Sequence, residues 1–249
     1  MFRLYLTGSV TIVGPDCTVE EAELPGGQGR VLVAALGLAH GPVPSDALAE
    51  RLWPTDMPTD WSKSLAPIVS RVRSKLRQAD PSQTATIRVA SGCHELVLPP
   101  DMWVDVEDAT RRLDRAEGHL RRGAAAAAWT DAAPASAVLR RPLLPGFDAP
   151  WVDGWRAVLD DRHHRCWIVL AEAWLQRDDP TLARTAACEA IAVDPYNEDG
   201  HRLLIRAELA AGNRSGAVRA AATCRTLLRE ELGVDPSPET IALEREVLG

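Results

Sequence analysis

The sequence predicts a mainly α-helical fold with small β-hairpins near the N-terminus, and three observations support this prediction. Short alternating stretches bounded by glycine and proline lie in the first hundred residues. An amphipathic stretch with helical spacing runs from residue 61 to 78. After residue 104 the composition shifts to alanine and arginine, and a helical pattern repeats. At 249 residues and 46% hydrophobic content the chain can form two domains, which we expect at 1–100 and 101–249.

The first elements are a hairpin and two helices. Residues 2–13 alternate and are rich in β-branched and aromatic side chains, which predicts a hairpin that ends at Leu24-Pro25-Gly26-Gly27. The apolar stretch Val31–His40 predicts a buried helix. Ser45 is a candidate N-cap for a second helix over residues 46–53.

The stretch Trp61–Gln78 predicts a third helix, with an apolar face and a cationic face. It holds five basic residues and no acidic one, in a chain of net charge −7. At about 100° per residue the apolar face carries Leu65, Ile68, Val69, Val72 and Leu76, and the opposite face carries Lys63, Ser70, Arg71, Ser74, Arg77 and Gln78. Clustered positive charge with small hydroxyl groups suits contact with phosphates and base edges. An ordinary solvated helix face is the alternative interpretation.

A second hairpin is predicted directly after this helix. Thr86–Val89 and Glu95–Leu98 have strand patterns on either side of Ser91-Gly92. Three helices flanked by a small sheet and a hairpin make a winged helix-turn-helix, whose third helix enters the major groove. We assign Lys63, Ser70, Arg71 and Ser74 to the groove and Arg73, Lys75 and Arg77 to phosphates. The full set assigned to DNA binding is Lys63, Ser64, Ser70, Arg71, Arg73, Ser74, Lys75 and Arg77.

The second half of the chain fits the tetratricopeptide pattern of 34 residues. With Pro195 at the proline position, the large and small positions are filled by Trp167, Leu170, Ala171, Trp174, Ala183 and Ala190, and the next frame by Leu204, Gly212, Ala217 and Ala221. Gly123 and Ala128 match the positions of Gly212 and Ala217 less closely. About three stacked repeats with a concave face are expected from Val104 to Leu248.

Together these stretches resemble the Streptomyces antibiotic regulatory protein family, in which an OmpR-like winged helix precedes a bacterial transcriptional activation domain. The resemblance rests on the ordered motifs RLW, VSRVRSKL, LLPGFDAPWVDGW, DPYNEDGHRLLIRAELAAGNRSGAV and REELGVDPSPETIAL. It implies a transcriptional activator that binds direct repeats at promoters, often as a side-by-side dimer, and contacts RNA polymerase. The resemblance also implies that the loop between the second and third helices faces polymerase, and there we single out Pro54, Thr55, Asp56 and Asp60.

Three departures from the family pattern weaken this inference. Pro67 lies within the cationic helix, where a proline can cost about 3 kcal/mol unless the helix starts near Ala66. Glu95 stands in the wing where the family commonly has arginine, and a carboxylate near phosphate lowers affinity. Pro134 is expected to kink the second helix of the first repeat.

Other chemistry is expected to be absent. The five cysteines are spread widely without a C-x-x-C pair, so neither a disulfide framework nor a structural zinc site is predicted. His163, His164 and Cys166 lack the spacing of a metal site, and Cys93-His94 lacks the geometry of a nucleophile and base. No G-x-x-x-x-G-K-[ST] motif is present, so no ATP site, cofactor or enzymatic activity is assigned. The N-terminus lacks a signal-peptide pattern and no stretch is long enough to span a membrane, which favours the cytoplasm.

Two further hypotheses remain open beside the DNA-binding regulator. Pro67 and Glu95 also fit a winged helix that has lost DNA binding, in a protein that acts as a tetratricopeptide interaction module. The concave surface of the repeats could sense a peptide or a small molecule in either case.

Overall fold

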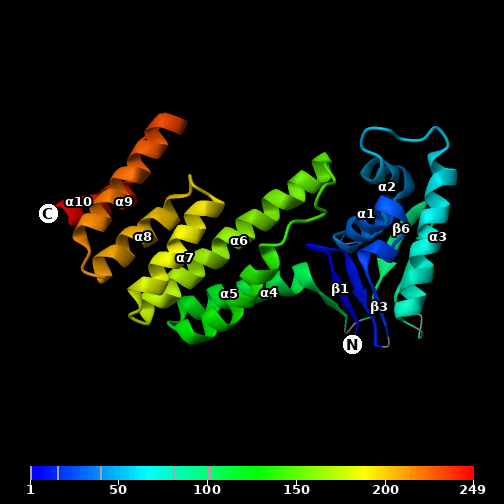
Figure 1. Ribbon diagram of the computed structural model, residues 1–249, viewed down its shortest axis with the longest axis horizontal. Coiled ribbons are helices and arrows are strands. Elements are labelled where there is room, and N and C mark those ends of the chain that lie inside the picture. Colours follow the sequence, from blue (N-terminus) through cyan, green and yellow to red (C-terminus); the bar gives the residue numbers. More distant parts are fainter. Residues whose placement is uncertain (1, 16, 40, 81, 83, 100–101) are drawn as a thin grey trace. The chain divides into compact units, whose positions relative to one another are not determined.

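The structure is a computed structural model that describes residues 2–15, 17–39, 41–80, 82, 84–99 and 102–249. The chain divides into two compact units (Figure 1). The first contains Met1–Asp108 and Arg141–Ala157, and the second contains Ala109–Arg140 and Val158–Gly249. This division differs from the single boundary expected at residue 100, because a later segment returns to the first unit. Pro100 itself lies outside the described residues.

The N-terminal hairpin belongs to a four-stranded sheet in the first unit. Strands β1 (Arg3–Tyr5) and β2 (Thr11–Val13) are antiparallel, as predicted, and Leu4 and Ile12 bury the inner face. Two strands of this sheet were not predicted: β3 (Thr18–Val19) pairs with β2, and β7 (Trp103–Val104) pairs parallel to β1. Strands of two residues are too short for alternation to reveal them. The strand order is β3-β2-β1-β7.

The first unit also contains three helices that pack against one another. They are α1 (Gly26–Gly37), α2 (Ser45–Leu52) and α3 (Trp61–Ala79), and a short 3-10 turn, η1 (Glu21–Glu23), precedes them. The prediction for α1 was wrong at its start, because Gly26, with a φ of 59°, begins the helix where a turn was expected. The described helix ends at Gly37, and the expected end at His40 lies outside the described residues.

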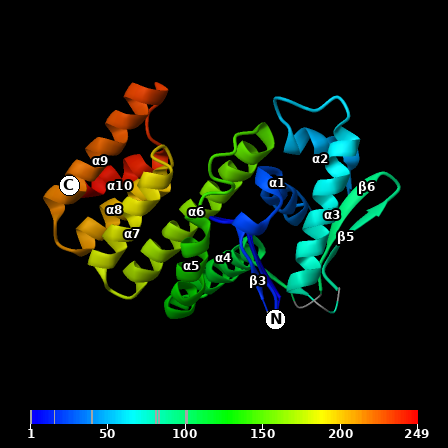
Figure 2. The ribbon, with the colours of Figure 1, turned by 45° about the vertical axis from the view of Figure 1, so that its right-hand side comes forward.

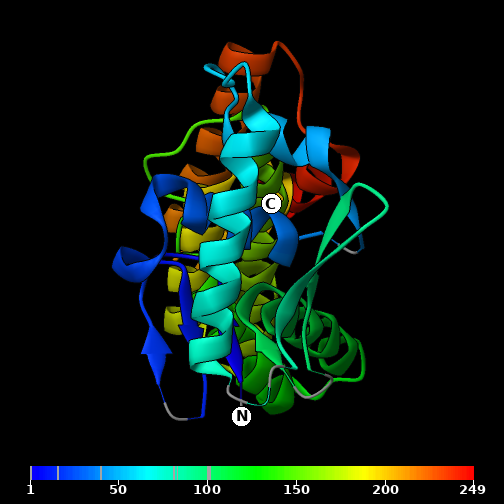
Figure 3. The ribbon, with the colours of Figure 1, turned by 90° about the vertical axis from the view of Figure 1, so that its right-hand side faces the viewer.

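The second hairpin forms the predicted wing. Strands β5 (Thr86–Ala90) and β6 (Cys93–Val97) are antiparallel, and β4 (Val43–Pro44) joins them in the order β4-β6-β5. Ser91 and Gly92 both have positive φ, 50° and 73°, as a two-residue turn of type I′ requires. Figures 2 and 3 both show the wing running beside α3.

The segment 141–157 completes the first unit. Thr7 bridges to Leu143, and the Gly8 N–H donates to the carbonyl of Pro142 at 2.8 Å. Arg156 donates to the carbonyl oxygens of Leu143, Leu144 and Phe147 at 3.0 to 3.2 Å, while Leu143 and Leu144 are buried. The family motif LLPGFDAPWVDGW is therefore part of the first unit's core.

The second unit is built from helical pairs (Figure 1). Helices α4 and α6 begin in the first unit and continue into the second. The elements are α4 (Asp105–Arg121), α5 (Ala125–Leu139), α6 (Pro150–Gln176), α7 (Pro180–Val193), α8 (Glu198–Ala210), α9 (Arg214–Leu227), a π-helical turn η2 (Leu228–Leu232) and α10 (Pro238–Leu248). A kink was expected at Pro134. In the structure α5 is one uninterrupted helix from Ala125 to Leu139, and Pro134 lies on its exposed side.

The turns inside the three pairs share one hydrogen-bond pattern. Gly123, Asp178 and Gly212 have φ values of 72°, 60° and 72°. In each turn this residue's N–H donates to the carbonyl three positions earlier, and the next N–H donates to the carbonyl five positions before it. The predicted tetratricopeptide-like architecture is confirmed, and the weak match of Gly123 to Gly212 in the sequence corresponds to the same backbone turn.

Candidate nucleic-acid interface

Helix α3 has the two faces that its sequence predicts. Leu65, Val69, Val72 and Leu76 are buried, and Ile68 is half-buried. The helix starts at Trp61 and contains Pro67, so the late start near Ala66 is wrong. The N–H groups of Lys63 and Ser64 donate to the carbonyl of Asp60 at 3.0 and 3.1 Å, which fixes the first turn ahead of the proline. Pro67 lies on the exposed face, where its ring needs no space in the core.

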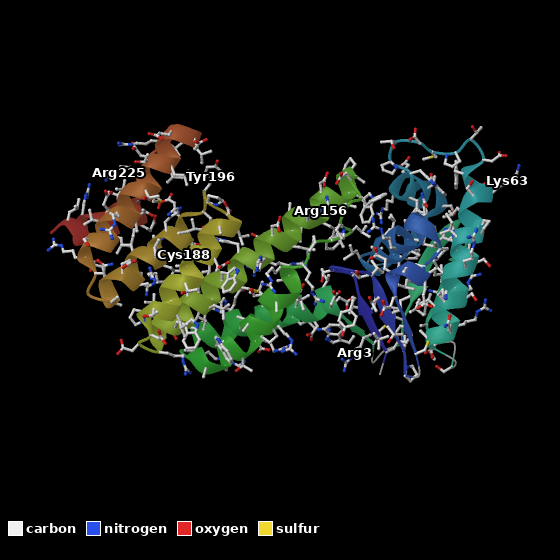
Figure 4. The ribbon with its side chains drawn as sticks, viewed as in Figure 1. Arg3, Lys63, Arg156, Cys188, Tyr196 and Arg225 are labelled. Atoms are coloured by element: carbon white, nitrogen blue, oxygen red, sulfur yellow. The ribbon has the colours of Figure 1, made fainter. Side chains whose placement is uncertain are left out.

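The outer face of α3 carries most of the residues assigned to DNA. Lys63, Ser70, Arg71, Ser74 and Arg77 are exposed, whereas Ser64, Arg73 and Lys75 are half-buried. In Figure 4 the Lys63 side chain points outward from the start of the helix. Ser70, Arg71, Ser74 and Arg77 therefore form a polar stripe along the second half of the helix, and the exposed Ala66 and Pro67 separate this stripe from Lys63.

The five cations of α3 do not have equal surroundings. Lys63 forms an ion pair with Asp60 at 3.0 Å, and Lys75 forms one with Glu23 at 3.2 Å. Arg73 donates to the carbonyl of Ile87. Within the part of the chain that the structure describes, no ion pair involves Arg71 or Arg77. These two arginines could therefore contact DNA without first breaking an ion pair within the protein.

The wing carries an ion pair at the position that departs from the family. Arg88 and Glu95 lie directly opposite each other on β5 and β6, and the Arg88 Nε donates to Glu95 Oε2 at 3.1 Å. Arg88 is the more exposed partner. Because its charge balances that of Glu95, the wing is locally neutral and less repulsive to phosphate than a lone carboxylate.

His94 belongs to the packing between the wing and α2. Its ring is buried, and Nδ1 lies 3.2 Å from the Ser45 hydroxyl. Burial, and then the charge of Arg73, lower the pKa of His94. Ser45 is not the N-cap predicted for α2, because the helix begins at Ser45 after Pro44 and its hydroxyl donates to the Gly92 carbonyl at 2.7 Å.

Asp80 connects the end of α3 to the wing. Its buried carboxylate accepts from the Ala85 N–H at 2.7 Å, from the Thr84 hydroxyl at 2.8 Å and from Ser82. Burial raises the pKa of Asp80, but the hydrogen bonds outweigh burial and bring it to about 2.

We expect Asp80 to make the first unit sensitive to acid. Because its folded-state pKa lies below the unfolded value, its stabilisation is present above about pH 4 and is lost as the pH falls towards 2. Urea unfolding of the wild type and of Asp80→Asn from pH 6 to pH 2.5 should show a gap in midpoint that narrows on acidification. A gap that stays constant would show that the ionised carboxylate contributes nothing.

The loop between α2 and α3 is exposed where polymerase contact is predicted. Pro54, Thr55 and Asp56 are exposed, and so is the apolar Met57, at 40%. Asp60 is exposed but paired with Lys63. Asp56 is therefore the acidic group of this loop that a basic partner could reach without breaking that pair.

His163 and His164 are helical core residues of the second unit. Both rings are buried, and the Trp167 Nε1 donates to His163 Nε2 at 3.0 Å. Among the described residues, no group of three or more His, Cys, Asp or Glu side chains is arranged to hold a metal ion. Within the same described residues, no helix has both the length and the apolar character needed to cross a bilayer.

Residues 104–248 match the family described as the bacterial transcriptional activator domain. The chain belongs to this family. Two regulatory proteins are similar over almost the whole chain: AfsR of Streptomyces griseus, 28% identical over 96% of this chain and 24% of AfsR, and EmbR of Mycobacterium tuberculosis, 28% identical over 95% of this chain and 62% of EmbR. The resemblance to the Streptomyces antibiotic regulatory protein family is thereby confirmed.

The structure of Mycobacterium tuberculosis EmbR in complex with a low-affinity phosphopeptide has the same fold. It aligns with a TM-score of 0.87 at 22% identity, over 99% of this chain and 65% of EmbR. The chain described in this structure thus spans less than two thirds of the length of AfsR and of EmbR.

Two contacts of the site were beyond sequence reasoning. The pairing of Arg73 with Ile87 and of Ser45 with Gly92 depends on how the wing folds back over the helices. The only signal in the sequence was the spacing between the cationic helix and the second hairpin, which leaves room for such a return.

Proposed function

We propose that this member of the bacterial transcriptional activator domain family binds promoter DNA through α3 and activates transcription. The observation that carries the proposal is the exposed stripe of Ser70, Arg71, Ser74 and Arg77 on the third helix of a winged fold. Arginine donates in pairs to guanine or to phosphate, and serine allows close approach. Membership in a family of transcriptional regulators supports this use of the stripe.

The proposal extends to the arrangement on DNA. We infer binding to direct repeats as a side-by-side dimer, with the loop Pro54–Asp60 directed to RNA polymerase. Exposure of Asp56 and Met57 supports that direction. A regulator of this kind acts in the cytoplasm, where the chromosome is.

Arg71→Ala tests the groove contact. We expect affinity for the selected site to fall by about tenfold and the slope of log K against log salt to fall by about one, since one positive charge that displaces counterions from the DNA is lost. Arg219→Ala is the matched control, because Arg219 is an exposed arginine on α9 of the second unit. Equal behaviour of the two variants would remove Arg71 from the interface.

The site itself is found by selecting genomic fragments bound by the purified protein at two salt concentrations. A repeated motif that is lost with Lys63→Ala/Arg71→Ala supports the regulator. The second candidate is an interaction module with a degenerate winged helix, which the internal pairing of Lys63, Arg73 and Lys75 favours. Absence of any motif would turn the search to protein or small-molecule partners of the repeats.

A further inference from the structure

The wing has a free edge along β5. The sheet order is β4-β6-β5, so β5 has a partner strand on one side only. Ala90 and Cys93 flank the two-residue turn and form a hydrogen-bonded pair, and in antiparallel strands such pairs alternate. Arg88 and Thr86 therefore bond to β6, whereas the carbonyl of Ile87 points to the free edge. With Ile87 only 2% exposed, this oxygen has little access to water.

Arg73 satisfies this edge carbonyl from α3. Its Nε and Nη2 both donate to the Ile87 oxygen, at 3.0 and 2.7 Å, and the side chain is half-buried. A guanidinium held by two hydrogen bonds to one acceptor has a fixed direction, and without Arg73 this buried carbonyl would be left unsatisfied.

A second contact holds the other end of the hairpin. The N–H and the hydroxyl of Ser45 both donate to the carbonyl of Gly92 in the turn, at 2.9 and 2.7 Å. The wing is thus tied near its base to α3 and at its tip to α2. The position of the wing is therefore fixed relative to α3, the helix that is proposed to lie in the major groove.

We infer that Arg73 is a positioning residue that sets the wing against α3, rather than a contact to a phosphate. This role rests on the proposed function, since it concerns how the wing meets DNA. It differs from the sequence-based assignment, in which Arg73 faced the backbone with Lys75 and Arg77. Arg71 and Arg77 then supply positive charge to the DNA, whereas Arg73 fixes the position of the wing.

Three variants of the full chain test this assignment: Arg73→Ala, Arg73→Lys and Arg71→Ala. Hydrogen exchange over residues 86–97 without DNA reports on the wing, and titration of the selected DNA site at several salt concentrations reports on charge. Arg73→Lys keeps the charge but cannot make the forked contact.

We expect both Arg73 variants to speed exchange over 86–97 by about tenfold, from the loss of a charge-assisted hydrogen bond. Both should weaken DNA binding and leave the salt slope unchanged. Arg71→Ala should leave the exchange unchanged and reduce the slope by about one.

The inference is overturned if Arg73→Lys binds as tightly as the wild type, or if Arg73→Ala lowers the slope by one with normal exchange. Should Arg73→Ala fail to fold, the milder lysine variant decides the question. If the wild type binds no DNA, the proposed function fails, while the exchange measurement still decides whether Arg73 holds the wing.

Discussion

Replacing Asp105 by asparagine is expected to destabilise the first unit by about 2–4 kcal/mol, since an amide cannot accept all of the hydrogen bonds now made to this buried carboxylate. Asp105 is 0% exposed. Its Oδ1 accepts from the N–H groups of Leu6 and Val106 at 3.0 and 2.8 Å, and its Oδ2 accepts from the N–H and hydroxyl of Thr7 at 3.0 and 2.7 Å. An asparagine amide would place a donor against at least one of these donors.

Chemical denaturation followed by tryptophan fluorescence measures this effect. The control is Asp114→Asn, which makes the same chemical change at an exposed position of the same helix and should alter stability by less than about 0.5 kcal/mol. Equal denaturation midpoints for the two variants would show that the hydrogen bonds of the Asp105 carboxylate do not stabilise the fold.

Gly14→Ala is the second change with a large expected effect. A Cβ atom at Gly14 would lie 1.7 Å from the carbonyl oxygen and 2.5 Å from the carbonyl carbon of Ala79, the last residue of α3. Backbone atoms cannot turn aside as a side chain can, so the strand and the helix end must separate. We expect a loss of about 3 kcal/mol and weaker DNA binding, because α3 is displaced.

Gly154→Ala is the matched control for this substitution. Gly154 lies inside α6 in the first unit, and nothing lies within 4 Å of its added Cβ. There alanine should be neutral or should stabilise the helix by up to about 1 kcal/mol. A Gly14→Ala protein as stable as this control would contradict the close approach of the sheet to α3.

The sequence predicted the elements with strong local patterns. The apolar stripe of Trp61–Gln78 became the buried face of α3, and the turn residues Ser91 and Gly92 closed the wing where expected. Errors came where local signals compete: Gly26 starts a helix although glycine and proline usually mark a turn, and Ser45 bonds to the wing instead of capping its own helix.

The candidate site was predictable in its outline and not in its internal contacts. Helical spacing alone showed that Arg71 and Arg77 would face outward. It could not show that Arg73 lies beside the wing, because that depends on where a hairpin fourteen residues further along folds back. Likewise, no pattern in the sequence indicates the contacts of Asp105 with Leu6 and Thr7, because they depend on the parallel pairing of β7 with β1.

The return of residues 141–157 to the first unit bears on how the DNA-binding half can be prepared. A truncated chain that ends near residue 100 loses β7, Asp105 and the buried pair Leu143 and Leu144. It would expose the edge of β1 and leave the N–H groups of Leu6 and Thr7 without their carboxylate. The winged helix is thus encoded by two stretches of the gene, which are separated by the stretch that encodes a helical hairpin. A chimaeric protein that takes its winged helix from a relative must therefore contain both stretches from that relative.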